Sequence, residues 1–219
     1  GSLRVSKLSA SITLNDKNQY YTGKSLGVTT TSSVEGLTVV LVYRDSEGVL
    51  VVDPTAPGTY DVTATIDDVN YEGNSTGTLT ITKAAATVTI SDTSKSFDGS
   101  PKTVTVVTVP AGLTTTITYT GGSFAGTSPS EAGDYNVSVS VVDNNYVGSV
   151  SAILTIGSVT IDNTAVVYTG TVQAPSVTLI PSDLTHNVTY TDSTGAVSSM
   201  KNANTYTVQV TVSDDRYSS

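Results

Sequence analysis

The sequence predicts an all-β protein made of three tandem repeats, each folded as a small sandwich of antiparallel strands. Only 13% of its 219 residues are charged and 6% are aromatic, a composition typical of strands and turns. Apolar residues alternate with polar ones at a period of two, and nowhere do they keep the helical i, i+3, i+4, i+7 spacing for three turns. The same landmark residues also recur three times along the chain.

The clearest strand pattern spans Gly58–Ile81. Every second residue from Tyr60 to Ile66 is apolar, and threonine or aspartate occupies the positions between them. One face of this strand is therefore expected to be buried and the other to face water. Asp67–Asn70 turns the chain, and Thr78–Ile81 alternates again as the returning strand. The stretch predicts a hairpin with a long connection.

Several landmarks keep a constant phase across the three copies. An aromatic residue followed by Gly two positions later occurs at residues 21–23, 97–99 and 168–170, and tyrosines recur at Tyr43, Tyr119 and Tyr190, at Tyr60, Tyr135 and Tyr206, and at Tyr71, Tyr146 and Tyr217. The steps between copies are 75 or 76 residues and then 71 residues. Each repeat is therefore small, and its core is expected to be supported by its neighbours.

The second copy has the most regular strand spacing. Strands are expected at Thr87–Ile90, Thr103–Val107, Thr116–Tyr119, Tyr135–Val141 and Ala152–Ile156. Short strands roughly 8–12 residues apart, with Gly, Pro, Asn and Asp in the turns, are typical of an immunoglobulin-like β-sandwich. The predicted fold is therefore three tandem immunoglobulin-like repeats.

The junctions between copies contain no flexible Gly/Ser linker. The closing strand of the first copy, ending near Ile81, is followed within a few residues by the strand at Val88, and Ile156 is followed even sooner by Val159. Connections of this kind are stiff compared with a coil linker. Three stacked units, with strands rising ~3.3 Å per residue, predict an elongated rod on the order of 100–130 Å long.

Two domain frames fit the repeats. In the first frame the domains are 1–83, 84–157 and 158–219; in the alternative frame they are 1–76, 77–150 and 151–219. Gly1–Leu14 matches Gly77–Ile90 at a constant offset of 76, so residues 1–6 correspond to the closing strand of a preceding unit. In the first frame the third domain lacks a closing strand, whereas in the alternative frame all three domains are whole.

The first frame leaves a sheet edge open in the third domain, and open edges pair readily with strands of other chains. It predicts head-to-tail self-association, in which Leu3–Val5 of one molecule completes the third domain of the next. Gly1-Ser2 is typical of a cloning remnant, and we expect the sequence to be a piece of a longer chain.

Charge and composition argue against several partners. The net charge of −9 disfavours nucleic acid, because phosphate binding needs a cluster of Lys and Arg. The chain has no Cys, which excludes disulfides and thiolate metal sites. No apolar run approaches the roughly 18 residues that a membrane-spanning helix needs, so no membrane insertion is expected.

Candidate chemistry is sparse, and no catalytic or cofactor-binding residue is expected. The one histidine, His186, falls in an expected turn and has no equivalent in the other copies, so we interpret it as a surface loop residue. Acidic residues do recur in turns, and weak calcium candidates are Asp67, Asp68, Asp143, Asp214 and Asp215. Asp also favours such turns without any metal. Lys7 and Lys83, near strand junctions, are weak candidates for an intramolecular isopeptide bond.

Several motifs together resemble a known family. They are the aromatic-x-Gly near Tyr168, the Gln173–Val177 run, Ala-Gly-Asp-Tyr135, Asn-Tyr71-Glu-Gly73 and Gly77–Ile81. In combination they resemble the MBG-type immunoglobulin-like repeats, which occur in arrays in large bacterial surface and secreted proteins. The resemblance implies an adhesin or a cell-surface stalk, and hence an extracellular or bacterial cell-surface location. The third copy departs from it, with Asn204 where the Gly of Gly-x-Tyr stands.

Two functions follow as hypotheses. The first is a non-catalytic structural spacer, whose partners are the neighbouring repeats of the same parent protein. The alternative is an adhesive module that binds a host or matrix glycan, mucin or protein through exposed tyrosines. Tyr43, Tyr60 and Tyr135 are in phase with the apolar faces and are expected to pack in cores. Tyr20 is unmatched in the other copies and is expected to be exposed, which makes it the better stacking candidate.

Overall fold

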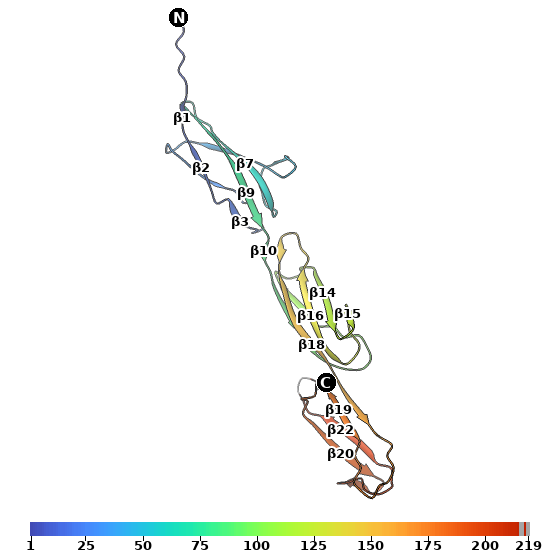
Figure 1. The fold of residues 1–219 in the computed structure, drawn as a ribbon. Coiled ribbons are helices and arrows are strands. Elements are labelled where there is room, and N and C mark those ends of the chain that lie inside the picture. The colour runs from blue at the N-terminus through green and yellow to red at the C-terminus, as the bar shows by residue number, and fades with distance from the viewer. Residues whose placement is uncertain (215–216, 218–219) are drawn as a thin grey trace. The chain divides into compact units, whose positions relative to one another are not determined.

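The computed structural model describes residues 1–214 and residue 217 of the chain. Its regular elements are all strands, which confirms the all-β prediction (Figure 1). Within the described residues there is no helix that could cross a membrane. Contacts divide the chain into two compact units, residues 1–86 with 141–148, and residues 87–140 with 149–219.

The first repeat lies in the first unit and has two main layers. One is a five-stranded sheet in the order β3-β9-β7-β5-β6, formed by Asn18–Tyr20, Asn74–Thr82, Gly58–Ile66, Val39–Arg44 and Leu50–Val51. The other is the antiparallel pair β2 (Ile12–Asn15) and β4 (Thr29–Ser32). The predicted hairpin is confirmed, because β7 and β9 pair antiparallel with Tyr60 opposite Leu79.

The core of this repeat lies between the two layers. The alternate residues of β7, from Tyr60 to Ile66, are buried as the period of two predicts. They pack in one cluster with Ile12 and Leu14 of β2 and with Leu79 of β9. This arrangement is a β-sandwich in which each layer buries one face.

Short parallel pairs complete the first unit. β1 (Leu8–Ser9) pairs with β8 (Tyr71–Glu72), and β10 (Ala84–Ala85) pairs with β17 (Tyr146–Val147). β3 also runs parallel to its neighbour β9. The sequence predicts antiparallel strands, and these segments of two or three residues are too short for alternation to reveal them.

The second repeat, in the second unit, follows the same plan. Its main sheet has the order β12-β18-β16-β14-β15, formed by Ser94–Ser96, Ser149–Asp162, Gly133–Val141, Thr115–Gly121 and Phe124–Gly126. The facing pair is β11 (Thr87–Ser91) with β13 (Thr105–Val109). Each of the five strands expected in this copy therefore has a counterpart, with β13 displaced toward the C-terminus by two residues.

The third repeat shares a strand with the second. β18 is 14 residues long; its first part pairs with β16, and Ser158–Asp162 pairs with β19 (Ser176–Ile180). The remaining strands form a three-stranded sheet in the order β21-β20-β22, from Gly195–Val197, His186–Asp192 and Thr207–Val212. Among the described residues, no strand pairs with the outer edge of β22. Both domain frames stay predictions.

Candidate functional site: the open groove of the third repeat

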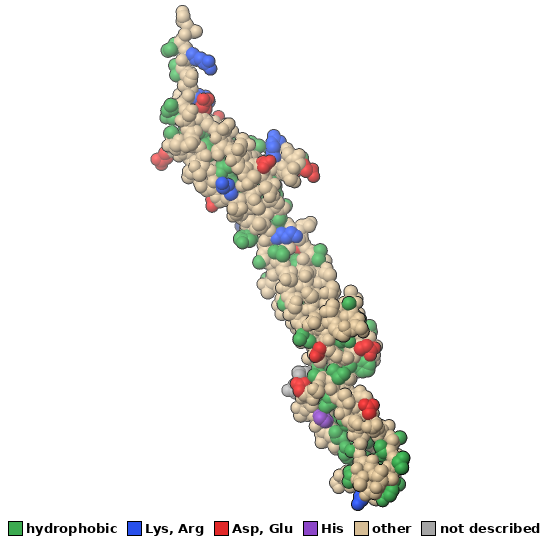
Figure 2. All heavy atoms as spheres, in the orientation of Figure 1, with side chains coloured by type: hydrophobic (Ala, Val, Ile, Leu, Met, Phe, Trp, Pro, Cys, Tyr) green, Lys and Arg blue, Asp and Glu red, His purple; other side chains and the backbone are tan. Residues whose placement is uncertain are grey.

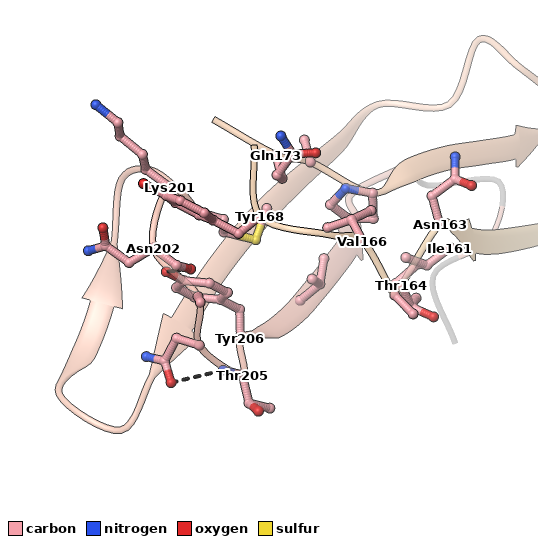
Figure 3. Close-up of a pocket in the computed structure, with 17 residues that line it drawn as sticks. Ile161, Asn163, Thr164, Val166, Tyr168, Gln173, Lys201, Asn202, Thr205 and Tyr206 are labelled. Atoms are coloured by element: carbon pink, nitrogen blue, oxygen red, sulfur yellow. Dashed lines mark hydrogen bonds between the residues drawn. The ribbon is translucent and has the colours of Figure 1, made fainter. Parts of the chain in front are cut away.

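A hollow of about 550 Å³ opens on the third repeat beside the outer edge of β22, with which no described strand pairs. Its walls come from residues 161–168, 173–175 and 200–208 (Figure 3). Tyr206 and Val208 project into it from the β22 side, and Val166 and Tyr168 line it from the opposite segment. We call this hollow, together with the outer edge of β22, the open groove.

The first two repeats reveal what occupies the equivalent position. Tyr206 is in phase with Tyr60 and Tyr135, which lie opposite Leu79 and Leu154 in their sheets. Both leucines belong to the closing strands β9 and β18, and both are 0% exposed. The open groove therefore lies where a closing strand lies in the other two repeats.

Within the described residues, the core of the third repeat is less completely covered than the cores of the other two repeats. Val208 is half-buried, whereas its counterparts Val62 and Val137 are fully buried. Residues 165–167 form no strand, although the equivalent segments β3 and β12 pair in parallel with closing strands. On the face drawn in Figure 2, hydrophobic side chains are prominent over this repeat, and among its exposed residues are Val166, Val167 and Tyr168.

The floor of the groove nevertheless has the same local structure as the closed repeats. The Tyr206 hydroxyl donates to the Asn202 carbonyl at 3.0 Å. The matching hydroxyls of Tyr60 and Tyr135 also donate to the carbonyl four residues upstream, at 2.7 Å and 2.9 Å. These bonds form a tyrosine corner of the kind found in immunoglobulin-like sandwiches. They explain why this tyrosine recurs in the sequence.

Burial changes the pKa of the tyrosine-corner hydroxyls in the first two repeats. Burial raises the pKa of the Tyr60 hydroxyl, and the nearby Asp45 carboxylate adds to the rise. Burial likewise raises the pKa of Tyr135, with a further contribution from Glu131. In both cases a phenolate would lose hydration and face a like charge, so the folded state favours the neutral hydroxyl.

A second tyrosine hydrogen bond is present in the first two repeats, whereas the third repeat has a proline at the donor position. The Val28 amide donates to the Tyr43 hydroxyl at 3.1 Å, and the Val104 amide donates to the Tyr119 hydroxyl at 2.9 Å. The equivalent donor position before Tyr190 is occupied by Pro175, which has no N–H. Tyr190 is half-buried, whereas Tyr43 and Tyr119 are buried.

The predicted exposure of the tyrosines is confirmed. Tyr43, Tyr60 and Tyr135 are buried, and Tyr20 on β3 is 73% exposed. Tyr168 at the rim of the open groove is also largely exposed. The sequence marks it only through the aromatic-x-Gly motif, which gives no indication of burial.

The acidic calcium candidates mainly have roles in turns. Asp68 Oδ1 accepts the amides of Asn70 and Tyr71, at 2.7 Å and 2.9 Å. Asp143 Oδ1 makes the same two bonds in the second repeat. Asp67 is exposed beside the first turn, Asp214 lies just beyond β22, and Asp215 lies outside the described residues. Residues 1–214 and 217 contain no group of three or more potential metal ligands, and calcium binding stays a prediction.

The other candidates from the sequence, two lysines and the histidine, lie beside main-chain carbonyl groups. The ammonium groups of Lys7 and Lys83 donate to the main-chain carbonyls of Asp68 and Asp143, each at 2.6 Å. His186 begins β20 rather than lying in the expected turn. It is exposed, and its Nδ1 is 3.1 Å from the Leu184 carbonyl oxygen.

One comparison with known proteins identifies a family. The MBG domain family matches residues 10–85, 86–158 and 157–219. Among solved structures, the chain is similar to the N-terminal four Ig domains of Dscam1 isoform 9.44 (with zinc), at 15% identity over 95% of this chain and 70% of that chain. The TM-score of that likeness is 0.26. No curated protein matches the sequence.

Proposed function

This chain belongs to the MBG domain family, and we propose that its three repeats act as a non-catalytic spacer in the stalk of a bacterial surface or secreted adhesin. The observation that carries the proposal is the strand shared by the second and third repeats. A spacer must hold its two ends at a fixed separation, and it can do so only if the connections between its repeats are stiff. No catalytic role forms part of the proposal.

The shared strand leaves little freedom at this joint. Ile156 of β18 is buried in the second repeat, and Ser158 already pairs with Ile180 of the third repeat. Only Gly157 separates them, and it is buried too. A Cβ at this glycine would lie 2.6 Å from the Tyr217 ring and 3.0 Å from the Ile180 carbonyl oxygen. Bending here requires breaking strand pairing or this close packing, unlike bending in a coil linker.

Close main-chain packing in the first unit supports the same proposal. A Cβ on Gly73 would lie 2.0 Å from the Ala10 carbonyl oxygen, and one on Gly148 would lie 2.4 Å from the Ala86 oxygen. In each case the segment that leads into a repeat lies directly against the turn that carries the glycine. The rings of Tyr21 and Tyr146 also meet edge to face in this unit, with centroids 5.5 Å apart.

Small-angle scattering tests the spacer role. The chain is expected to have a maximum dimension on the order of 100–130 Å, from stacked units whose strands rise ~3.3 Å per residue. The matched variant has a short Gly/Ser insertion between Gly157 and Ser158, which should leave the sheet content unchanged and broaden the distribution of intramolecular distances. A maximum dimension near ~60 Å would contradict the elongated arrangement. An insertion without effect would contradict the stiff joint.

An adhesive module remains the second candidate, because Tyr20 and Tyr168 are exposed and aromatic faces stack on sugars. Binding of the chain to a panel of glycans, mucins and matrix proteins tests it. A saturable interaction that Tyr20→Ala or Tyr168→Ala abolishes would favour adhesion. A panel without binding would leave the spacer role, with adhesion assigned to another part of the parent protein.

A further inference from the structure

We propose that the β5–β6 hairpin of the first repeat is a contact surface for a second copy of this chain, with β6 of the two copies pairing antiparallel about a two-fold axis. The inference goes beyond the spacer role, which a single chain can perform. It rests on a group of exposed aliphatic side chains that the equivalent hairpins of the other two repeats do not have.

Aliphatic side chains gather on the outward face of this hairpin. Val40, Leu50 and Val52 are 46%, 57% and 79% exposed, and Val42 is half-buried. Leu50 lies opposite the exposed Arg44, and the other three alternate with core-facing residues along the chain, so all four belong to the side of the sheet that faces away from the core. We call Val40, Val42, Leu50 and Val52 the aliphatic patch.

The other two repeats show that this hairpin folds without aliphatic residues on its outward face. The equivalent hairpins are β14–β15 and β20–β21, and in all three the landmark tyrosine of the longer strand lies opposite the last residue of the shorter one. The four positions of the aliphatic patch are occupied there by alanine or polar residues, namely Thr116, Thr118, Ala125 and Thr127 in the second repeat and Asn187, Thr189, Ala196 and Ser198 in the third. Exposed aliphatic side chains that the fold does not require, gathered in one place, indicate a binding surface.

Charge and strand pairing favour a second copy as the partner. β6 is the last strand of its sheet, and no described strand pairs with its outer edge. Residues 49–52 along this edge carry no charge, whereas the chain as a whole carries a net charge of −9. Two copies therefore repel each other over much of their surface, and this edge is a place where they can approach without bringing like charges together.

Charge also selects the register of the pairing. A two-fold axis through Val51 places Leu50 opposite Val52 of the second copy and places Glu47 opposite Thr55. An axis through Leu50 would instead place Glu47 opposite Asp53 of the second copy. Like charges directly opposite each other on paired strands are destabilising, so the axis through Val51 is favoured.

In this register the aliphatic patches of the two copies form one continuous surface. Starting from Arg44 of one copy, an outward row passes through Leu50 to Val52 and Val42 of the second copy. Cross-strand pairs of this kind stabilise a sheet. Because β6 has only two residues, the interface is smaller than the roughly 1,200 Å² of a stable complex, and the dissociation constant is expected to be on the order of 0.1–1 mM.

Analytical ultracentrifugation of the whole chain tests the surface, and a reversible dimer is expected as the concentration rises toward about 1 mM. Val52→Lys should weaken the dimer by about a hundredfold, because each dimer would lose two buried valines. Thr127→Lys makes the same change of charge at the equivalent exposed position of the second repeat and should leave the dimer unchanged, and both variants should melt like the parent. A parent chain that stays monomeric at about 1 mM, or two variants that associate equally well, would overturn the proposal.

Cross-linking tests the register, and the absence of native Cys makes it specific. Chains carrying Leu50→Cys are mixed with chains carrying Val52→Cys, and a mixed disulfide is expected because directly opposite residues on paired strands lie within disulfide reach. The control partner is a chain carrying Thr127→Cys, whose thiol is exposed at the equivalent position of the second repeat. Equal cross-linking to both partners would refute the register and the proposal with it.

Discussion

Replacement of Leu154 by Ala measures how much a closing strand contributes to the repeat that it closes. Leu154 is 0% exposed on β18 and lies opposite Tyr135. Removing a fully buried Leu side chain costs about 2–5 kcal/mol, and the absence of exposure points to the middle of that range, about 3 kcal/mol. The neighbouring Ile153 is 57% exposed on the same strand. Ile153→Ala is therefore the matched control, with an expected loss below about 1 kcal/mol.

Urea unfolding of the whole chain, followed by circular dichroism, provides the free energies. Tandem repeats need not unfold in one step, so the region that loses stability is located by hydrogen exchange of β16 and β18. The Leu154 variant should exchange faster in both strands, and the Ile153 variant should match the parent. Equal losses of unfolding free energy in the two variants would refute the reasoning. Stability would then depend on side-chain size and not on burial in the core of the second repeat.

Three further predictions concern other features of the fold. Gly148→Ala should cost about 1–3 kcal/mol in urea unfolding, because its Cβ would meet the Ala86 carbonyl at 2.4 Å. Gly58→Ala, whose Cβ would have its nearest contacts with the Tyr60 side chain at 3.8 Å, should cost less. The raised pKa of Tyr135 predicts a contribution to the free energy of unfolding that is fully present below pH about 10 and is lost as the pH rises through the folded-state pKa. Tyr135→Phe should therefore make the unfolding free energy vary less with pH in the alkaline range. Calcium binding by the turn aspartates predicts a melting temperature that falls on chelation, and an unchanged melt would contradict it.

The fold could be predicted from the sequence wherever a strand has one buried and one exposed face. Gly58–Ile66 is such a strand, and its alternation identifies the buried residues correctly. The recurring tyrosines could be assigned to cores because they are in phase with the apolar residues, but the hydrogen bonds of their hydroxyl groups could not be predicted. Those bonds depend on the backbone four residues upstream of Tyr60 and on the Val28 amide near Tyr43, which only the folded turns bring within reach.

Other features have no periodic signal. The parallel pair of β1 with β8 involves two residues on each strand, too few for a period to show. Gly73 and Gly148 did recur in the sequence, in the motif Asn-Tyr-x-Gly. The reason for the glycine is a main-chain oxygen from a segment more than 60 residues away, and this contact exists only after folding.

The open groove was predictable in part. The phase of the landmarks places Tyr206 at the position of Tyr60 and Tyr135, which are buried in the first two repeats. The hollow itself lies beside the outer edge of β22, with which no strand of the described residues pairs. No residue type marks this cavity, because its walls come from segments that are separate in the sequence and meet only in the folded chain.

The closing strand has two structural roles, and they link stability to stiffness. The first part of β18 pairs with β16 of the second repeat, and Ser158–Asp162 pairs with β19 of the third repeat. Loss of packing at Leu154 should therefore loosen the joint as well as the core. Hydrogen exchange in β19 is expected to rise together with that in β16 in the Leu154→Ala chain, because one strand carries both pairings. Exchange that rises in β16 alone would mean that the two repeats open independently although they share a strand, and the shared strand would then no longer account for a stiff spacer.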